Sequence, residues 1–465
     1  MKSISVLALS VALAGCATFS EDGGFRAVES AARERLDKDV KWVRSDADGE
    51  SLRQTVAKLL AAPLSADSAV QIALLNNRGL QAIYAELAIA EADLVQAGRI
   101  RNPHYTLSRV GRGNGLPDID EAISLEIISI LMLPLRSRME ARRFEAVKLS
   151  VSERMLKLAQ ETRRAYFQAL ASAEVARYMD QVRESADASA LLAERMASAG
   201  NVAKLTRMRE MSFHAEVMAN MERARHAAVA HRERLTRMMG LGGDELTYQL
   251  PERLPDLPAR MTERTSIEEM ALRDRLDVQA AKRGTEHMAA SLGLTKATRF
   301  INVFEAGRVR KKDGDQPYHY GYEISLELPL FDWGGARVAK AEALYMQAVA
   351  HVADVAINAR SEVREAYAAY RHAYEAAKHY RDEVVPLRKR ISEETLLRYN
   401  GMLISVFELL ADAREQIAGV SAYIQSLRDF WLAAADLQTA MTIGSPGAMT
   451  VIRSGTIAAA ASGGH

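Results

Sequence analysis

Two long stretches almost free of helix breakers constrain the fold of this chain most strongly. Residues 135–199 contain neither proline nor glycine, and residues 336–400 contain no glycine and one proline. Each stretch of 65 residues would form a continuous helix about 97 Å long. Globular domains rarely contain helices of this length. Gly200 and Gly401 follow the two stretches, so we expect each helix to end in a reversal, from which the chain returns along 202–239 and 402–441.

A membrane-type strand precedes the second stretch. Over residues 320–329, apolar side chains alternate strictly with small or acidic ones. A strand has a side-chain period of two, and strands of membrane barrels present one apolar face to lipid, edged by aromatic girdles. The apolar face comprises Tyr320, Tyr322, Ile324, Leu326 and Leu328, and the polar face comprises Gly321, Glu323, Ser325 and Glu327. We therefore expect Glu323 and Glu327 to face a lumen.

The chain repeats itself. Ile123–Glu126 and Ile324–Glu327 have the same sequence, ISLE, 201 positions apart, and Gly200 and Gly401 share that offset. Several matches at one offset indicate an internal duplication. Glu126 is then predicted to face the lumen as Glu327 does, with Ile123, Leu125 and Ile127 facing lipid.

Each half is predicted to contain a helix, a β-hairpin, the long helix and a returning helix. The first helices are expected at 66–96 and 266–297, and the strands at 104–110, 122–130, 299–306 and 319–328. Segments rich in glycine, aspartate, proline and charge separate the paired strands, which is turn chemistry.

The N-terminus reads as a lipoprotein signal. A lysine precedes a short apolar stretch, and Leu13–Cys16 forms a lipobox around the only cysteine of the chain. We expect residues 1–15 to be removed and Cys16 to be lipidated. An ordinary signal peptide with a buried thiol is the alternative. Ala17, in place of the aspartate that often retains lipoproteins at the inner membrane, favours the outer membrane.

Composition excludes several other functions. The 61 basic residues balance the 60 acidic ones, and no basic run indicates nucleic-acid binding. The histidines show no metal-ligand spacing, and no nucleophile–base or paired-acid arrangement indicates an enzyme. Neither a metal nor a cofactor is predicted. Gly334-Gly335 is interpreted as a strand-to-helix corner, not a phosphate loop.

Over about residues 60–443 the chain resembles the lipoprotein branch of the TolC family of outer-membrane efflux channels. The most specific matches are Leu326–Ala343 (LELPLFDWGGARVAKAEA) and Arg398–Glu415 (RYNGMLISVFELLADARE). The resemblance implies a mainly α fold with a small β part. Three chains with four strands each would close a transmembrane β-barrel above a long periplasmic α-helical barrel. Such a channel conducts passively and works with a periplasmic adaptor protein and an inner-membrane pump.

The resemblance also implies functional residues near the two reversals, farthest from the membrane. The residues expected to contact the adaptor are Gly200, Asn201, Val202, Lys204, Tyr399, Gly401, Met402 and Ser405. An acidic gate near the channel axis is expected at Glu408 and Asp412, with Arg398 as a restraining partner. Ordinary solvated helix residues are the alternative for both acids.

The predicted organisation has five parts. These are a signal peptide (1–15), a lipidated segment (16–60), two channel repeats (61–250 and 251–443) and a flexible tail (444–465). A periplasmic adaptor and a structural coiled-coil lipoprotein are alternatives. The adaptor would need a single hairpin beside a β-domain, and the coiled coil would lack amphipathic strands. The 19 methionines do not identify the substrate, because methionine in long helices usually fills gaps in packing. Export of metal ions and export of drugs or other organic solutes are therefore equal alternatives.

Overall fold

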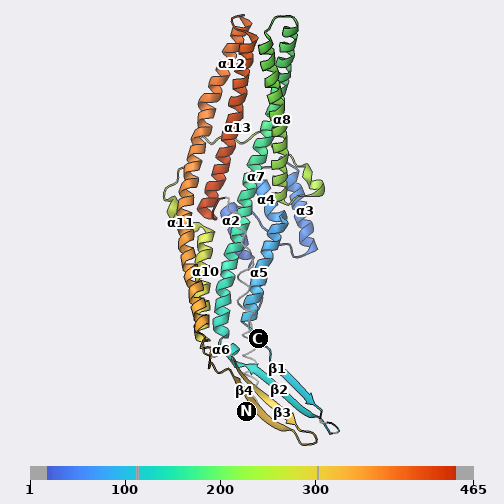
Figure 1. The fold of residues 1–465 in the computed structure, drawn as a ribbon, viewed down its shortest axis with the longest axis vertical. Helices are drawn as coiled ribbons and strands as arrows, with labels where there is room; N and C mark the ends of the chain where they lie inside the picture. Colours follow the sequence, from blue (N-terminus) through green and yellow to red (C-terminus); the bar gives the residue numbers. More distant parts are fainter. Residues whose placement is uncertain (1–17, 112, 114, 301–302, 447–465) are drawn as a thin grey trace.

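The molecule is long and narrow, with its helices running along its length (Figure 1). The fold is that of a computed structural model, which describes residues 18–446 except 112, 114 and 301–302. A small sheet forms one end, and the two helical reversals form the other. Cys16, the signal peptide and most of the predicted tail lie outside the described residues.

The two halves have the same order of elements. The first half contains α2 (Arg26–Leu36), α3 (Asp46–Leu60), α4 (Ala66–Asn76), α5 (Arg78–Ala97), β1 (His104–Val110), β2 (Asp118–Glu126), α6 (Ile127–Leu131), α7 (Leu133–Ser198), α8 (Lys204–Met239) and the 3₁₀ turn η1 (Gly243–Thr247). The second half contains α9 (Ile267–Asp274), α10 (Leu276–Ala297), β3 (Phe304–Lys312), β4 (His319–Leu326), α11 (Gly335–His379), the π-helix η2 (Tyr380–Val384), α12 (Val385–Asn400) and α13 (Val406–Thr442). The long helices and the internal duplication are therefore confirmed. Among the described residues, no helix combines the length and apolar composition needed to cross a bilayer.

Two predicted strands have the wrong bounds. β2 ends at Glu126, and Ile127, expected on the lipid face, begins the short helix α6. A short apolar run such as 127–131 has no periodicity that separates strand from helix. β3 lies at 304–312 instead of 299–306, and so includes charged residues predicted to form a turn. Pairing with the strands on both sides overrides the low strand propensity of lysine there.

The π-helix η2 absorbs one extra residue of the second half. Before it, equivalent buried residues such as Ala165 and Ala366 are 201 positions apart. After it, the buried Met239 and Met441 are 202 positions apart. A π turn holds one residue more than an α turn, so the returning helices keep their register. Pro386 follows at the start of α12, and its missing N–H and its ring disrupt the α-helical bonding of the preceding turn.

The helix predicted at the start of each half is interrupted by one extended residue, and the side chain of that residue caps the last helix of the same half. Asn77 separates α4 from α5, and Arg275 separates α9 from α10, both with extended backbones. Asn77 Nδ2 donates a hydrogen bond to the Met238 carbonyl at 2.9 Å. Arg275 Nη1 donates to the Ala440 carbonyl at 3.3 Å. The last carbonyls of α8 and α13, which lack partners within their helices, are satisfied in this way.

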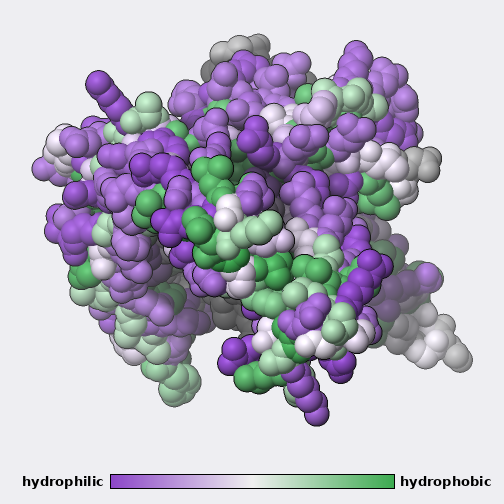
Figure 2. Space-filling model, turned by 90° about the horizontal axis from the view of Figure 1, so that it is seen from above, coloured by the Kyte–Doolittle hydropathy of each residue, from purple (hydrophilic) through white to green (hydrophobic). Residues whose placement is uncertain are grey.

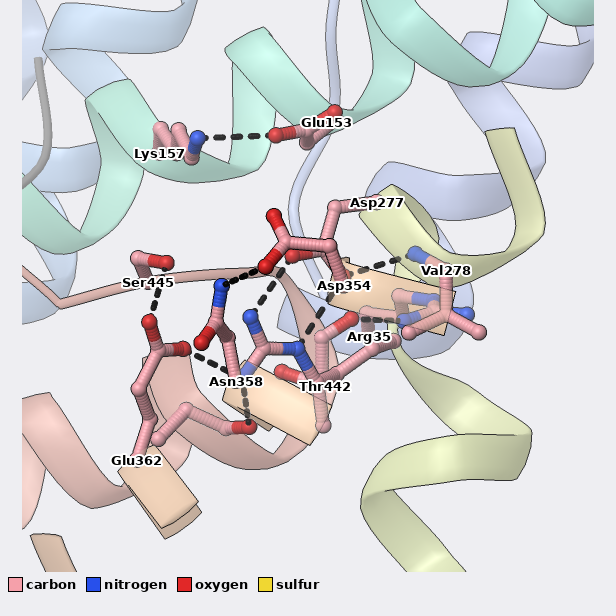
Figure 3. A network of polar contacts seen from close by, with 12 residues as sticks. Arg35, Glu153, Lys157, Asp277, Val278, Asp354, Asn358, Glu362, Thr442 and Ser445 are labelled. Carbon is pink, nitrogen blue, oxygen red and sulfur yellow. Dashed lines mark hydrogen bonds and ion pairs between the residues drawn. The ribbon is translucent and has the colours of Figure 1, made fainter. Parts of the chain in front are cut away.

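Arg275 is the centre of a buried ion network, and Figure 3 labels its partners Asp277 and Glu362. Its side chain is 1% exposed, with Asp277 at 2.6 Å and Glu362 at 2.8 Å. Ser445 Oγ donates to the other Glu362 oxygen at 2.6 Å. Burial alone would lower the pKa of Arg275, but the hydrogen bonds and charges of the two carboxylates outweigh it and raise that pKa. The network joins α9–α10, α11 and the end of α13.

The sheet joins the two halves. Its strand order is β1-β2-β3-β4 and every pair is antiparallel. β2 of the first half pairs with β3 of the second, with Ile123 opposite Arg308. β1 and β4 form the two edges. An unpaired edge in lipid is not tolerated, because its backbone groups have no water to bind.

Two larger clusters of buried hydrophobic side chains stabilise the middle of the bundle. In the first, Phe430 packs against Tyr370, Tyr374 and Trp431, with ring centroids 5.1 to 5.8 Å apart. In the second, Val28 of α2 is fully buried beside residues of α5 and α7. The N-terminal segment therefore packs on the bundle as part of its core.

Candidate functional site

The corner between β4 and α11 depends on one glycine. Gly334 has φ +70°, and a Cβ there would lie 2.5 Å from the Arg299 carbonyl oxygen. Asp332 Oδ1 accepts the Gly334 N–H at 2.8 Å, and Arg299 Nε donates to the Trp333 carbonyl at 3.0 Å. Only glycine fits this backbone without strain. The FDWGG motif therefore turns the chain from the sheet into α11.

Exposed apolar side chains surround this corner. Phe331 is 99% exposed and Trp333 is 59% exposed. The ring of Phe300 packs edge-on against that of Trp333, with the two ring centroids 6.5 Å apart. Tyr320 and Tyr322, 64% and 87% exposed, lie nearer the far end of β4. From Tyr320 to Leu328 an extended chain spans roughly 26 Å. Aromatic residues therefore lie at both ends of an exposed aliphatic segment, as in the two girdles of a membrane barrel.

The register assigns the predicted lumen residues to one face of the sheet. Glu126 is opposite Glu305, and Glu323 is opposite Gly307. Directly opposed residues project from the same face. Arg101 Nη1 forms an ion pair with Glu126 at 2.7 Å. Glu327 lies just after β4, and its backbone N–H continues the pairing by donating to the Val303 carbonyl at 3.1 Å.

Three further acids share this face. Asp118 and Asp120 lie on this face of β2, and Glu305 lies on this face of β3. Together with Glu126 and Glu323 they make five carboxylates on this face of the four strands. Lys311 is the lysine that the strands place on this face, and its Nζ lies 4.0 Å from Asp120. Asp118 and Asp120, two positions apart in the sequence DIDEAISLE, were a signal for two of them, but the bounds predicted for β2 began at residue 122.

The first reversal has a glycine in the left-handed conformation. Gly200 has φ +74°, and the Asn201 N–H donates to the Met196 carbonyl at 2.9 Å. This is the Schellman pattern of a helix C-terminus. Asn201 and Lys204 are exposed, and Val202 is half-buried. No side chain caps the start of α8.

In the second reversal the left-handed residue is Met402, not Gly401. Met402 has φ +58°, whereas Gly401 has φ −78°. The Leu403 N–H donates to the Arg398 carbonyl at 2.9 Å, so Met402 is the structural equivalent of Gly200. The shift of one residue follows from η2. A non-glycine residue here carries strain of about 1–2 kcal/mol.

The second reversal also exposes large apolar side chains. Met402 is 93% exposed, Leu403 is 77% exposed and Tyr399 is 37% exposed. Seen from the end where the reversals lie, hydrophobic side chains gather in patches on a mostly hydrophilic surface (Figure 2). Leu403 was not among the predicted contact residues, because one leucine between helices carries no signal in the sequence.

Ser405 and Glu408 form a capping box. The Glu408 N–H donates to Ser405 Oγ at 3.2 Å, and the Ser405 N–H donates to Glu408 Oε1 at 3.5 Å. The pair satisfies two backbone donors at the start of α13. Ser405 and Glu408 therefore have a structural role in addition to any role in docking or gating.

The side chains of the predicted gate residues form no hydrogen bond or ion pair with one another among the described residues. Arg398 Nε forms an ion pair with Glu394 of its own helix at 2.9 Å. Among the described residues no ion pair joins Arg398 to Glu408 or Asp412. Glu408 is exposed, whereas Asp412 is half-buried with Oδ2 shielded from solvent and without a hydrogen-bond partner among the described residues.

A second charged contact ties the returning helices together. Arg414 of α13 forms an ion pair with Glu210 of α8, whose side chain is 5% exposed. Ser189 Oγ of α7 donates to Glu210 at 2.8 Å, and the Arg414 guanidinium lies 4.1 Å from the centre of the Phe213 ring. This contact holds the helix that carries Asp412 against the first repeat. Sequence spacing offered no signal for it, since its members are up to 225 positions apart.

No family model and no curated protein sequence matches the chain. Solved structures do match it. OprN, an outer-membrane channel, has a TM-score of 0.68 at 20% identity, covering 83% of this chain and 92% of OprN. The MtrE outer membrane channel of Neisseria gonorrhoeae has a TM-score of 0.67 at 17% identity, covering 80% and 88%. CusC, described for its transmembrane channel formation, has a TM-score of 0.66 at 16% identity, covering 82% and 92%.

The chain therefore has the fold of these outer-membrane channels. The predicted fold class, mainly α with one small sheet and an internal duplication, is confirmed.

Proposed function

We propose that this chain is one protomer of a trimeric outer-membrane channel that conducts substrates passively out of the periplasm. The observation that carries the proposal is a sheet with two chemically different faces at one end of the molecule (Figure 1). The sheet is joined to α7, whose 66 residues extend over about 99 Å. One face of the sheet is acidic, and the other is apolar beside the corner. The likeness to solved outer-membrane channels supports the same function.

A trimer follows from the two free edges of the sheet. Four strands are too few to close a barrel, and twelve strands from three chains can close one. Pairing β4 of one protomer with β1 of the next would satisfy both edges and form a continuous lumen lined by Glu126, Glu323 and Glu327.

The direct test is reconstitution of the full-length protein. Electron microscopy of the purified protein should reveal an elongated trimer with a central channel, and planar bilayers containing it should conduct. A monomeric particle, or a trimer that adds no conductance, would contradict the proposal.

Docking of a periplasmic adaptor protein is assigned to the two reversals. This assignment rests on their distance from the sheet and on the exposed Met402, Leu403 and Tyr399. The adaptor would in turn connect the channel to an inner-membrane pump. The other predicted positions, Gly200, Asn201, Val202, Lys204 and Gly401, would complete the contact.

Ser405 allows docking to be separated from helix capping. Ser405→Asp keeps an N-cap acceptor but adds a charge to the surface. We expect trimers and bilayer conductance to persist while export in cells is lost, as measured by sensitivity to exported compounds in a deletion strain. Ser405→Asn, which keeps the cap without a charge, is the matched control. Full export with Ser405→Asp would argue against docking here.

Lipidation at Cys16 is proposed from the lipobox. Cys16→Ser should leave an unprocessed chain without acyl groups, as determined by intact mass spectrometry. A variant that is still cleaved after residue 15 and acylated would disprove the assignment. Because a closed barrel would hold the protein in the membrane by itself, we expect conduction to survive when the variant is expressed with a cleavable signal peptide.

A further inference from the structure

A row of basic side chains lies on the face of the sheet opposite the acidic one. Arg308, Arg310 and Lys312 alternate along β3, so they share one face. Arg308 is opposite Tyr322, and Arg310 is opposite Tyr320. The basic row (Arg308, Arg310, Lys312) is therefore on the same face as Ile324 and Leu326.

Aromatic rings accompany these cations. The guanidinium of Arg310 lies 4.5 Å from the ring centre of Tyr318, and that of Arg308 lies 5.8 Å from the ring centre of Tyr320. Lys312 Nζ lies 5.6 Å from the ring centre of Tyr318. Tyrosine rings attract cations and prefer the boundary between lipid and water.

The positive charge of this face is not neutralised by its neighbours. Arg109 of β1 shares the face through Ile119, which pairs with both Arg109 and Lys312. Within the four strands the single acid of this face is Glu121, which pairs with Arg310 at 2.5 Å. Four cations and one carboxylate therefore leave a surplus of three positive charges, whereas the other face has five carboxylates and one lysine.

The aliphatic and basic side chains of this face differ in their position along the strands. Leu125, Ile324 and Leu326 lie toward the helices, whereas the basic row begins at Arg308, opposite Ile123, and extends toward the β3–β4 turn. An amphiphile with an anionic head and acyl chains would contact both regions at once. Arginine forms bidentate hydrogen bonds with phosphate, and positions two residues apart on a strand are about 7 Å apart.

We propose that the basic row binds phosphate-bearing lipid headgroups, with the acyl chains packed along the aliphatic part of the same face. The proposal rests on the proposed function, since it requires this face to be the outer surface of a barrel. It assigns the turn-proximal end of the sheet to the headgroup layer and adds a phosphate-binding site to the face assigned to lipid.

The test uses a double variant and a control on the same strand. Arg308→Gln with Lys312→Gln removes two cations but leaves the Arg310–Glu121 pair intact. Lys311→Gln removes a cation from the opposite face. Native mass spectrometry of detergent-purified trimers counts bound lipid, with bisphosphorylated lipid A and its dephosphorylated form as the two probes.

Wild type and Lys311→Gln should both prefer the phosphorylated lipid. Each cation removed from the basic row should weaken its binding about fivefold. Equal binding of the two lipids by wild type, or equal binding by the double variant and Lys311→Gln, would overturn the proposal. Displacement of the lipid by inorganic phosphate alone would also overturn it, because the row would then be a site for free anions.

Conductance separates this proposal from the proposed function. The double variant should conduct like wild type in planar bilayers, because the basic row does not line the lumen. If wild type fails to conduct, the channel function is wrong, whereas lipid counts in detergent remain a test of the site.

Discussion

At the residue scale, Gly334 is the position where one added methyl group should matter most. Its φ is +70°, and a Cβ would meet the Arg299 backbone oxygen at 2.5 Å. We expect Gly334→Ala to cost about 1–3 kcal/mol of stability through backbone strain and to reduce the yield of assembled trimer. Gly335→Ala is the matched control, since a Cβ there meets nothing within 4 Å. Equal thermal stability of the two variants would show that the corner relaxes freely.

At the element scale, the sheet is defined by its two faces. Leu326 is 48% exposed on the face assigned to lipid, and Glu327 is the next residue. Leu326→Arg should cost about 2–4 kcal/mol near mid-bilayer and prevent assembly. Glu327→Arg should assemble and shift ion selectivity toward anions, because it would reverse a charge on the face assigned to the lumen. Heat-resistant trimers on gels and reversal potentials measure the two effects. Similar assembly defects in both variants would refute the assignment of faces.

At the scale of the whole molecule, the proposed channel would leak at rest unless the end with the reversals were closed. Three copies of Glu408 and Asp412 would bring six carboxylates toward one axis, and such a group attracts cations. Asp412→Asn together with Glu408→Gln removes the charge and keeps the capping box. We expect higher conductance and weaker block by multivalent cations in planar bilayers. If the double variant shows wild-type conductance and wild-type block by multivalent cations, these residues do not line the gate.

Asp412→Asn alone and Glu408→Gln alone divide that effect between the two acids. Asp412 has a shielded oxygen without a partner among the described residues, and Arg414, two residues later, ties its helix to Glu210. We therefore expect Asp412→Asn to produce most of the change in block.

The local patterns of the sequence determined the elements of this protein. A run without glycine or proline is sufficient to predict α7, and strict alternation is sufficient to predict β4, because both depend on neighbours close in sequence. The repeated ISLE and the FDWGG corner likewise identified the duplication and the fold. Helix ends and strand bounds were less predictable. Arg308 to Lys312 have the composition of a turn, and they form a strand only because β2 and β4 pair with them.

The tertiary structure alone decided which distant residues meet. Burial of Arg275 between Asp277 and Glu362, and the contact of Arg414 with Glu210, join segments that no periodicity connects. The π-helix shifted the left-handed position from Gly401 to Met402, although the sequence offset had indicated the glycine. The two charged faces of the sheet exist only once the register is set, since a slip of one residue would exchange them.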